Sequence, residues 1–201
     1  MTPRQGGHPL PVAVYLFYRH RGEGNIHGKL PPLYSYSVWR PLLWRPWPTG
    51  KVKFKTKCRF LFRSALHCLR LFNGRECGAL CVFRENSLVH YSGFTPRYWR
   101  FPFLQDSDLQ IGDTWTEPSH RGKGLALFAL LEIIRIKRKP GRKFWYVVGG
   151  LNTPSIRVVE KAAFSLVGKG TFIVPLGIKL LGSYVMSSRS LEQDKLINDY
   201  V

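Results

Sequence analysis

The amino-acid sequence predicts an α/β fold built on one mixed sheet flanked by helices. Its C-terminal half reads in order as strand, glycine loop, helix, strand, helix and strand, an alternation typical of sheets covered by helices. Before it, two apolar runs at residues 77–83 and 88–93 are separated by Glu85-Asn86, which predicts an antiparallel hairpin. With 201 residues and 44% hydrophobic content, the chain can bury one core and is short for two full domains.

The first strand of the C-terminal half spans residues 109–116. Pro118 ends it, because proline cannot continue a hydrogen-bonded ladder. Residues 122–138 then predict a helix with one apolar stripe. Basic residues followed by Pro140-Gly141 mark its end.

The next strand is the strongly apolar run at residues 143–148. Asn152 or Thr153 then caps a second helix, with Pro154 in its tolerated first-turn position. Residues 166–174 begin a terminal pair of strands. The C-terminal half is therefore expected to contribute at least three strands to the sheet and two helices that flank it.

The composition divides the chain into three parts. Residues 1–50 are rich in proline, glycine, arginine and tryptophan, and predict an irregular basic aromatic segment that is an arm or a part of the same domain. Residues 51–186 are expected to form the folded domain, and residues 187–201 a polar C-terminal tail.

Two basic stretches open the folded part. Lysines alternate with other residues over residues 51–57, which predicts a strand with one charged and solvated face. Residues 59–72 fit a basic amphipathic helix or a further strand, and the pattern leaves that choice open.

Residues 121–126, Arg-Gly-Lys-Gly-Leu-Ala, lie between the strand at 109–116 and the helix that follows. Two closely spaced glycines let the backbone turn tightly and direct successive N–H groups at an anion, and the helix N-terminus adds its positive dipole. The spacing matches neither the dinucleotide fingerprint nor the P-loop. The sequence therefore predicts a cradle for a pyrophosphate of another kind.

The formal net charge of +19 predicts attraction to polyanions, which include nucleic acid, an anionic membrane and phosphorylated ligands. No nucleic-acid recognition motif is present, so nucleic acid is disfavoured. The four cysteines lack the spacing of a zinc site, and no metal is expected. There is neither a signal-peptide pattern nor an apolar run long enough to span a membrane, which favours the cytoplasm. The basic aromatic region at residues 39–72 leaves peripheral docking on the inner face of an anionic membrane open.

Two motifs in this order resemble the GNAT superfamily of acetyl-CoA-dependent N-acetyltransferases. The first is Pro-Ser-His-Arg-Gly-Lys-Gly-Leu-Ala at residues 118–126, and the second runs from Asn-Thr-Pro-Ser-Ile to Glu-Lys-Ala-Ala-Phe over residues 152–164. The resemblance covers roughly residues 77–170. The amino-acid sequences of these two motifs, together with residues 111–116, look most like those of members associated with surface-polysaccharide and lipopolysaccharide assembly.

The resemblance implies a mostly antiparallel, twisted sheet that is splayed between two central strands. The loop at residues 121–126 would wrap the pyrophosphate of acetyl-CoA, the cosubstrate. The strand edges near residues 114–117 and 147–149 would take its pantetheine arm and thioester. The implied cofactor-binding residues are Trp115, Thr116, Arg121, Gly122, Lys123, Gly124, Leu125, Ala126, Asn152 and Ser155.

The catalytic groups are less sharply defined. An amine must lose a proton to attack a thioester, and a departing thiolate benefits from a proton donor. Asp113 and Glu117 share strand parity, so both are expected to face the splayed cleft as candidate bases. In many family members a tyrosine donor follows the matching asparagine by seven residues, but Val159 occupies that position here. Tyr146 is the substitute that we include as a candidate donor.

The leading functional hypothesis is N-acetylation of an amino sugar on a nucleotide-linked or lipid-linked carrier, by direct transfer in a ternary complex. The positive charge suits such an anionic acceptor. Acetylation of a protein N-terminus or lysine is the enzymatic alternative. A non-catalytic scaffold that binds an anionic partner is the alternative of another class.

Overall fold

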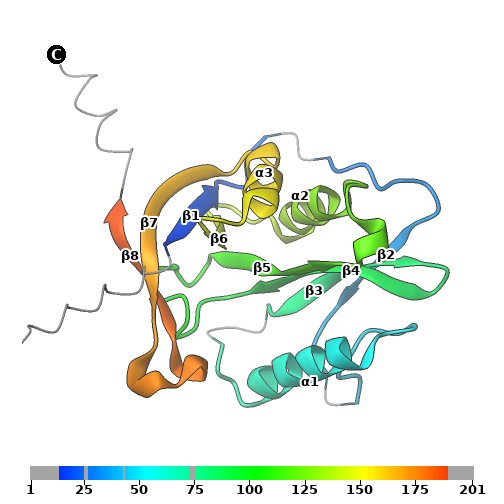
Figure 1. Ribbon diagram of the computed structural model, residues 1–201, viewed down its shortest axis with the longest axis horizontal. Helices are drawn as coiled ribbons and strands as arrows, with labels where there is room; N and C mark the ends of the chain where they lie inside the picture. The colour runs from blue at the N-terminus through cyan, green and yellow to red at the C-terminus, as the bar shows by residue number, and fades with distance from the viewer. Residues whose placement is uncertain (1–13, 25–26, 43, 73–75, 190–201) are drawn as a thin grey trace, which may run out of the picture.

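The computed structural model describes residues 14–24, 27–42, 44–72 and 76–189. They form one eight-stranded sheet in the order β2-β3-β4-β5-β6-β1-β7-β8, with α1 on one face and α2 and α3 on the other (Figure 1). The strands are β1 (Tyr15–His20), β2 (Ser35–Trp39), β3 (Gly78–Arg84), β4 (Ser87–Thr95), β5 (Leu109–Thr116), β6 (Phe144–Gly149), β7 (Ser165–Ile173) and β8 (Ser183–Arg189). The helices are α1 (Phe54–Cys68), α2 (Leu125–Lys137) and α3 (Thr153–Lys161). Among these eight strands only β5 and β6 pair in parallel, so the predicted mixed, mostly antiparallel sheet is confirmed.

The N-terminal segment contributes two strands, so the prediction of an irregular segment is wrong for these residues. β1 lies between β6 and β7, with Phe17 and Tyr18 buried. β2 forms the sheet edge beside β3. Their short lengths and the prolines and glycines around them hide the pattern, and β1 is stabilised by antiparallel pairing on both sides. Residues 1–13 of this segment lie outside the described part.

The strand predicted at residues 51–57 is also wrong, because α1 begins at Phe54. Thr56, Phe60 and Ser64 recur every four residues and are the buried positions of α1, which is the period of a helix and not of a strand. Solvated lysines do not constrain which period the chain adopts over so short a stretch. For residues 59–72, the helical alternative is the one that the structure confirms through Cys68.

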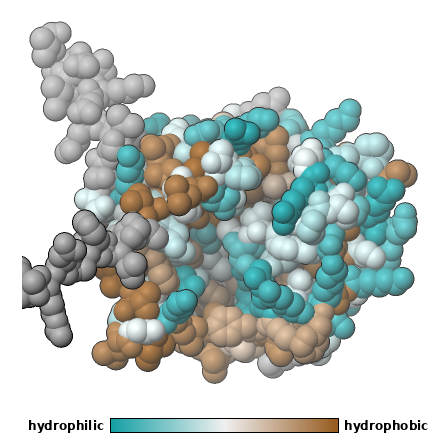
Figure 2. All heavy atoms as spheres, viewed as in Figure 1, coloured by the Kyte–Doolittle hydropathy of each residue, from teal (hydrophilic) through white to brown (hydrophobic). Residues whose placement is uncertain are grey.

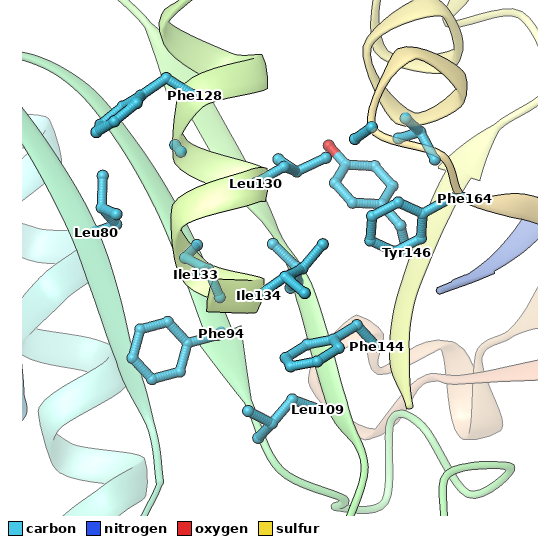
Figure 3. Close-up of a cluster of buried hydrophobic side chains, with 14 of the residues drawn as sticks. Leu80, Phe94, Leu109, Phe128, Leu130, Ile133, Ile134, Phe144, Tyr146 and Phe164 are labelled. Carbon is cyan, nitrogen blue, oxygen red and sulfur yellow. The ribbon is translucent and has the colours of Figure 1, made fainter. Parts of the chain in front are cut away.

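The main core lies between α2 and the sheet (Figure 3). Leu130, Ile133 and Ile134 of α2 are fully buried against apolar side chains of the central strands. On the opposite face, Trp39, Phe60 and other aromatic residues form a smaller cluster beneath α1. The cores hold β4 and β5 from both faces, which fixes the strands that carry the candidate site.

The ends of the C-terminal elements follow their sequence signals. The Asn152 side chain accepts a hydrogen bond from the Ser155 backbone N–H at 3.3 Å and caps α3, with Pro154 in the first turn.

The hairpin turn at Glu85 and Asn86 has positive φ at both residues, as a tight two-residue turn requires. β8 continues to Arg189, into the part expected to be the polar tail, and residues 190–201 lie outside the described residues.

Glu76 ties the residues before β3 to those before β6. Arg142 Nη1 donates to its Oε2 at 2.7 Å, and Lys139 donates to its Oε1. Burial alone raises the pKa of Glu76, but the hydrogen bonds and charges of Arg142 and Lys139 outweigh burial and lower the pKa to about 2. The carboxylate therefore stabilises the fold above its unfolded pKa, and this contribution is lost as the pH falls towards 2.

Glu76→Gln is expected to lower the free energy of unfolding by about 1 kcal/mol at neutral pH, a modest value because solvent screens the partly exposed pair. The difference from the parent protein should shrink as the pH falls to about 2, where the parent carboxylate is protonated. Urea unfolding of both proteins over this pH range measures the difference in their free energies of unfolding. Glu85→Gln, at the exposed hairpin, is the matched control and should be nearly silent. A difference that does not change with pH would contradict the ion-pair account.

Candidate active site

The loop between β5 and α2 has the backbone geometry of an anion cradle. Gly122 and Gly124 have φ values of 75° and 77°, a left-handed conformation that glycine adopts without strain. A side chain added at either glycine would meet no atom within 4 Å, so the backbone is open to close approach. No side chain caps the N-terminus of α2, and its first turn holds no acidic residue. The first N–H groups of the helix are thus available to an anion.

The loop side chains surround this backbone. Arg121 and Lys123 are exposed, and Arg121 Nε donates to the Thr116 carbonyl oxygen at 3.3 Å, which holds the guanidinium near the end of β5. Leu125 is buried in the main core and anchors the helix start. His120, just before the loop, shares a 2.8 Å hydrogen bond with the Tyr34 hydroxyl. The cradle is therefore basic on its solvent side and fixed on its core side.

The sheet opens between β5 and β6, next to this loop. The two strands pair only at Leu109 with Phe144 and at Gln110 with Trp145. Beyond these pairs β5 stays joined to β4, and β6 stays joined to β1. The splay expected near residues 114–117 and 147–149 is present.

A β-bulge in β5 sets which side chains face each side of the opening. Asp113 and Thr114 together oppose Ser92 of β4, since the register shifts between Tyr91 and Gly93. Asp113 adopts a φ of 49°, which aspartate tolerates better than most residues. The bulge turns Asp113 towards α1, on the other side of the sheet from α2.

On the α2 side, a buried row of polar groups crosses from β4 to β5. His90 shares hydrogen bonds with the hydroxyls of Thr116 at 2.7 Å and Ser92 at 3.1 Å, and Ser92 with Thr114 at 3.1 Å. Burial lowers the pKa of His90 to about 3, so its imidazole is neutral at physiological pH. His90 therefore orders hydroxyls in the opening without bringing a charge into it.

Tyr146 of β6 borders the same opening from its other strand (Figure 3). Burial raises the pKa of Tyr146, and hydrogen bonding to Thr114 and Ser155 offsets part of this rise. Its hydroxyl thus stays protonated at neutral pH and is placed between β5 and the start of α3. This arrangement suits a proton donor.

On the α1 side, two arginines one helical turn apart face Asp113. Arg63 Nη2 lies 3.0 Å from Asp113 Oδ2, and Arg59 Nη1 lies 3.7 Å from Oδ1. Arg59 also donates to the Tyr91 hydroxyl at 2.9 Å. The Arg63 guanidinium occupies the space that a side chain at Gly93 would fill. Phe60 lies beside these groups, and the charged side chains among them, Arg59, Arg63 and Asp113, carry a net positive charge.

The model of a protein family described as "Acetyltransferase (GNAT) family" matches residues 37–164. The chain belongs to the GNAT acetyltransferase family. It is thus an acyltransferase, and the family uses acetyl-CoA as its cosubstrate. A search of curated proteins gave no match to the chain.

Solved structures agree with this GNAT fold. A GCN5-related N-acetyltransferase from Sphaerobacter thermophilus aligns with a TM-score of 0.55 and 15% identity, over 80% of this chain and 50% of that one. A tandem GNAT protein from the clavulanic acid biosynthesis pathway gives 0.54 and 15%, over 79% and 52%. A GNAT acetyltransferase from Colwellia psychrerythraea gives 0.51 and 14%, over 77% and 53%. This chain spans about half the length of each, and at these identities the likeness concerns the fold.

The cradle fits the pyrophosphate of acetyl-CoA, because its backbone is open, its helix N-terminus lacks a side-chain cap, and Arg121 and Lys123 are exposed. Ser155 lies at the start of α3 against Tyr146. Asn152 uses its side-chain oxygen to cap α3, which leaves its amide group for a ligand. Val159, at the position of the family's usual tyrosine, is fully buried.

The two candidate bases and Trp115 lie towards α1. Trp115 stacks on Tyr91 with ring centroids 5.9 Å apart. Glu117 accepts a hydrogen bond from Lys53 Nζ at 2.8 Å, just before α1. The shared parity of Asp113 and Glu117 therefore holds, and both side chains meet basic residues on the α1 side.

Sequence reasoning did not identify Arg59 and Arg63 as site residues. Their spacing of four is the usable signal, since it puts both on one face once residues 59–72 are taken as a helix. Across the described residues, no group of three or more His, Cys, Asp or Glu side chains is arranged to hold a metal ion. Within that same part of the chain, no helix has the length and apolar character needed to cross a membrane.

Proposed function

We propose that this GNAT acetyltransferase transfers acetyl from acetyl-CoA to a primary amine on an anionic acceptor, in a ternary complex. The single observation that carries the choice of acceptor is the pair of arginines, Arg59 and Arg63, around Asp113 beside the splayed strands. An amino sugar on a nucleotide-linked or lipid-linked phosphate has the required amine and anion. We include in this proposal that the protein acts in surface-polysaccharide assembly.

The chain's residues divide the work between the two sides of the sheet. Acetyl-CoA, when bound, supplies the thioester carbonyl that the amine attacks. The proposed holders of its pyrophosphate and pantetheine parts are the loop from Arg121 to Ala126 and the strand edges beside it. Arg59, which is partly exposed, binds the acceptor's anionic group, while Arg63 is the better buried member of the pair.

Proton transfer is assigned to the candidate catalytic residues. Asp113 accepts the proton that the amine loses as its nitrogen–carbon bond forms, and Glu117 is the second candidate for this role. Tyr146 donates its proton to the sulfur as the carbon–sulfur bond breaks. The buried Tyr146 hydroxyl keeps this proton at neutral pH because desolvation raises its pKa.

Arg59→Ala is expected to raise KM about tenfold for an anionic amine acceptor and to leave KM for acetyl-CoA unchanged, because one charge-assisted contact is removed. Thiol release over a panel of amino-sugar nucleotides and neutral amino sugars measures it. Lys55→Ala, one exposed charge on the same helix, is the matched control. Turnover confined to peptide amines would favour the protein acetyltransferase alternative. Tight CoA binding without turnover of any amine would favour a non-catalytic role.

A further inference from the structure

The outward face of α1 carries more large apolar side chains than its buried face. Phe54, Leu61, Phe62 and Leu69 are exposed, Phe54 at 82% and Leu69 at 68%. At 3.6 residues per turn they lie on one stripe of the helix. A surface helix normally turns such a stripe to the core, whereas the core side of α1 holds Thr56 and Ser64 beside Phe60.

A second apolar segment lies in the connection between β7 and β8. Two short 3₁₀ turns, Pro175–Gly177 and Lys179–Leu181, shape this connection. It exposes Leu176 at 90%, together with Ile178, Leu180 and Leu181. Single exposed aliphatic side chains are common on protein surfaces, but four of them within six residues form a contiguous apolar patch.

Aromatic residues join the two segments into one surface. Phe72, just after α1, packs on Tyr98 with ring centroids 5.0 Å apart, and Tyr98 packs on Trp99 at 4.9 Å. Trp99 Nε1 donates to the Leu180 carbonyl oxygen at 3.1 Å. Both segments lie along the lower side of Figure 1, where Figure 2 shows apolar residues gathered at the same edge. We call this surface the apolar rim, made of Phe54, Leu61, Phe62, Leu69, Leu176, Ile178, Leu180 and Leu181.

The charged residues of the two segments that carry the apolar rim have one sign. By helical geometry, Lys55 and Lys57 flank the α1 stripe on its two sides. Lys179 lies within the β7–β8 connection. Residues 51–72 and 174–183 contain no aspartate or glutamate. An exposed apolar stripe bordered by lysines is the pattern of a helix that lies in the interface of an anionic membrane.

We propose that the apolar rim docks the protein on an anionic lipid bilayer, with α1 parallel to the membrane plane. The exposed apolar side chains enter the headgroup boundary, and the lysines contact lipid phosphates. The ion pair of Arg59 and Asp113 lies on the inward side of the same helix, so docking brings it near the headgroups. If the proposed function holds, this placement favours a lipid-linked amine as the acceptor. The docking itself does not depend on that function.

Sedimentation with vesicles of phosphatidylglycerol and phosphatidylcholine tests the docking. The parent protein should bind at low salt, bind more weakly at high salt, and bind pure phosphatidylcholine at least tenfold more weakly. Leu69→Asp and Leu176→Asp should each weaken binding to anionic vesicles about tenfold or more. Leu33→Asp is the matched control, because Leu33 is 77% exposed and precedes Tyr34, which contacts His120 on the α2 side.

Three results would overturn the docking. The first is that the parent protein does not bind anionic vesicles at low salt. The second is that Leu33→Asp and Leu69→Asp weaken vesicle binding equally. The third is that a second copy of the chain covers the apolar rim. Equilibrium sedimentation detects the last case as a dimer that Leu69→Asp dissociates while vesicle binding persists. Circular dichroism verifies that the variants are folded. Acetylation of soluble acceptors is assayed without vesicles, so a failure of docking and a failure of the proposed function are read separately.

Discussion

Arg121→Glu is expected to weaken CoA binding by at least thirtyfold, about 2 kcal/mol. The substitution removes a guanidinium from the edge of the cradle and places a carboxylate where the pyrophosphate is proposed to bind. The fold should be unaffected, because Arg121 is exposed and, among the described residues, its side chain makes a single hydrogen bond, to the Thr116 carbonyl oxygen. Titration calorimetry with CoA and with acetyl-CoA measures the loss.

Lys161→Glu is the matched control for this charge reversal. Lys161 is exposed at the C-terminal end of α3, and the substitution changes the net charge of the protein by the same amount. Equal weakening in both variants would mean that long-range attraction, and not the loop, determines affinity. Unchanged binding in Arg121→Glu would remove the loop from the cofactor site.

Tyr146→Phe is expected to lower kcat about a hundredfold, the scale of losing one general acid, with KM for acetyl-CoA changed less than about threefold. The substitution removes only the hydroxyl that is placed beside Thr114 and Ser155. Burial raises the pKa of Tyr146, so the parent enzyme should lose no activity through this group as the pH rises across the neutral range. Steady-state thiol release from about pH 6 to 9 measures both effects.

Tyr18→Phe provides a control that is matched in position and chemistry. Tyr18 is the cross-strand partner of Tyr146, and its hydroxyl donates to Glu160 Oε1 at 3.0 Å. Its loss should cost about 1 kcal/mol of stability and leave kcat near the parent value. If Tyr18→Phe lowered kcat as much as Tyr146→Phe, the effect would be structural and the proton-donor role would fail.

The sequence allowed prediction of those elements whose signals are local. The apolar run at 109–116 coincides with β5, and the cap at Asn152 coincides with the start of α3. The glycines of residues 121–126 predicted a tight turn before α2, and in the structure Gly122 and Gly124 turn the backbone with positive φ values. Each of these features depends on neighbours in the chain, so a single sequence was enough to place it.

Features that depend on distant partners could not be predicted. β1 is a strand because β6 and β7 pair with it on either side. The side of the sheet that Asp113 faces depends on a bulge opposite Ser92, and its basic partners come from a helix fifty residues earlier in the chain. The alternating lysines at 51–57 were uninformative because solvated positions carry no period of their own.

The position of β1 has a consequence for how the sheet assembles. Tyr15 is paired with Gly149 of β6 on one side and with Gly170 of β7 on the other, so the first described strand in the chain pairs with two of the last three. On a ribosome, β1 emerges before the other described strands and must stay unpaired until β6 and β7 have been synthesised. The loop that closes is long, and contacts of this kind slow folding. Completion of the sheet beside the opening between β5 and β6 is therefore expected to be a late folding event.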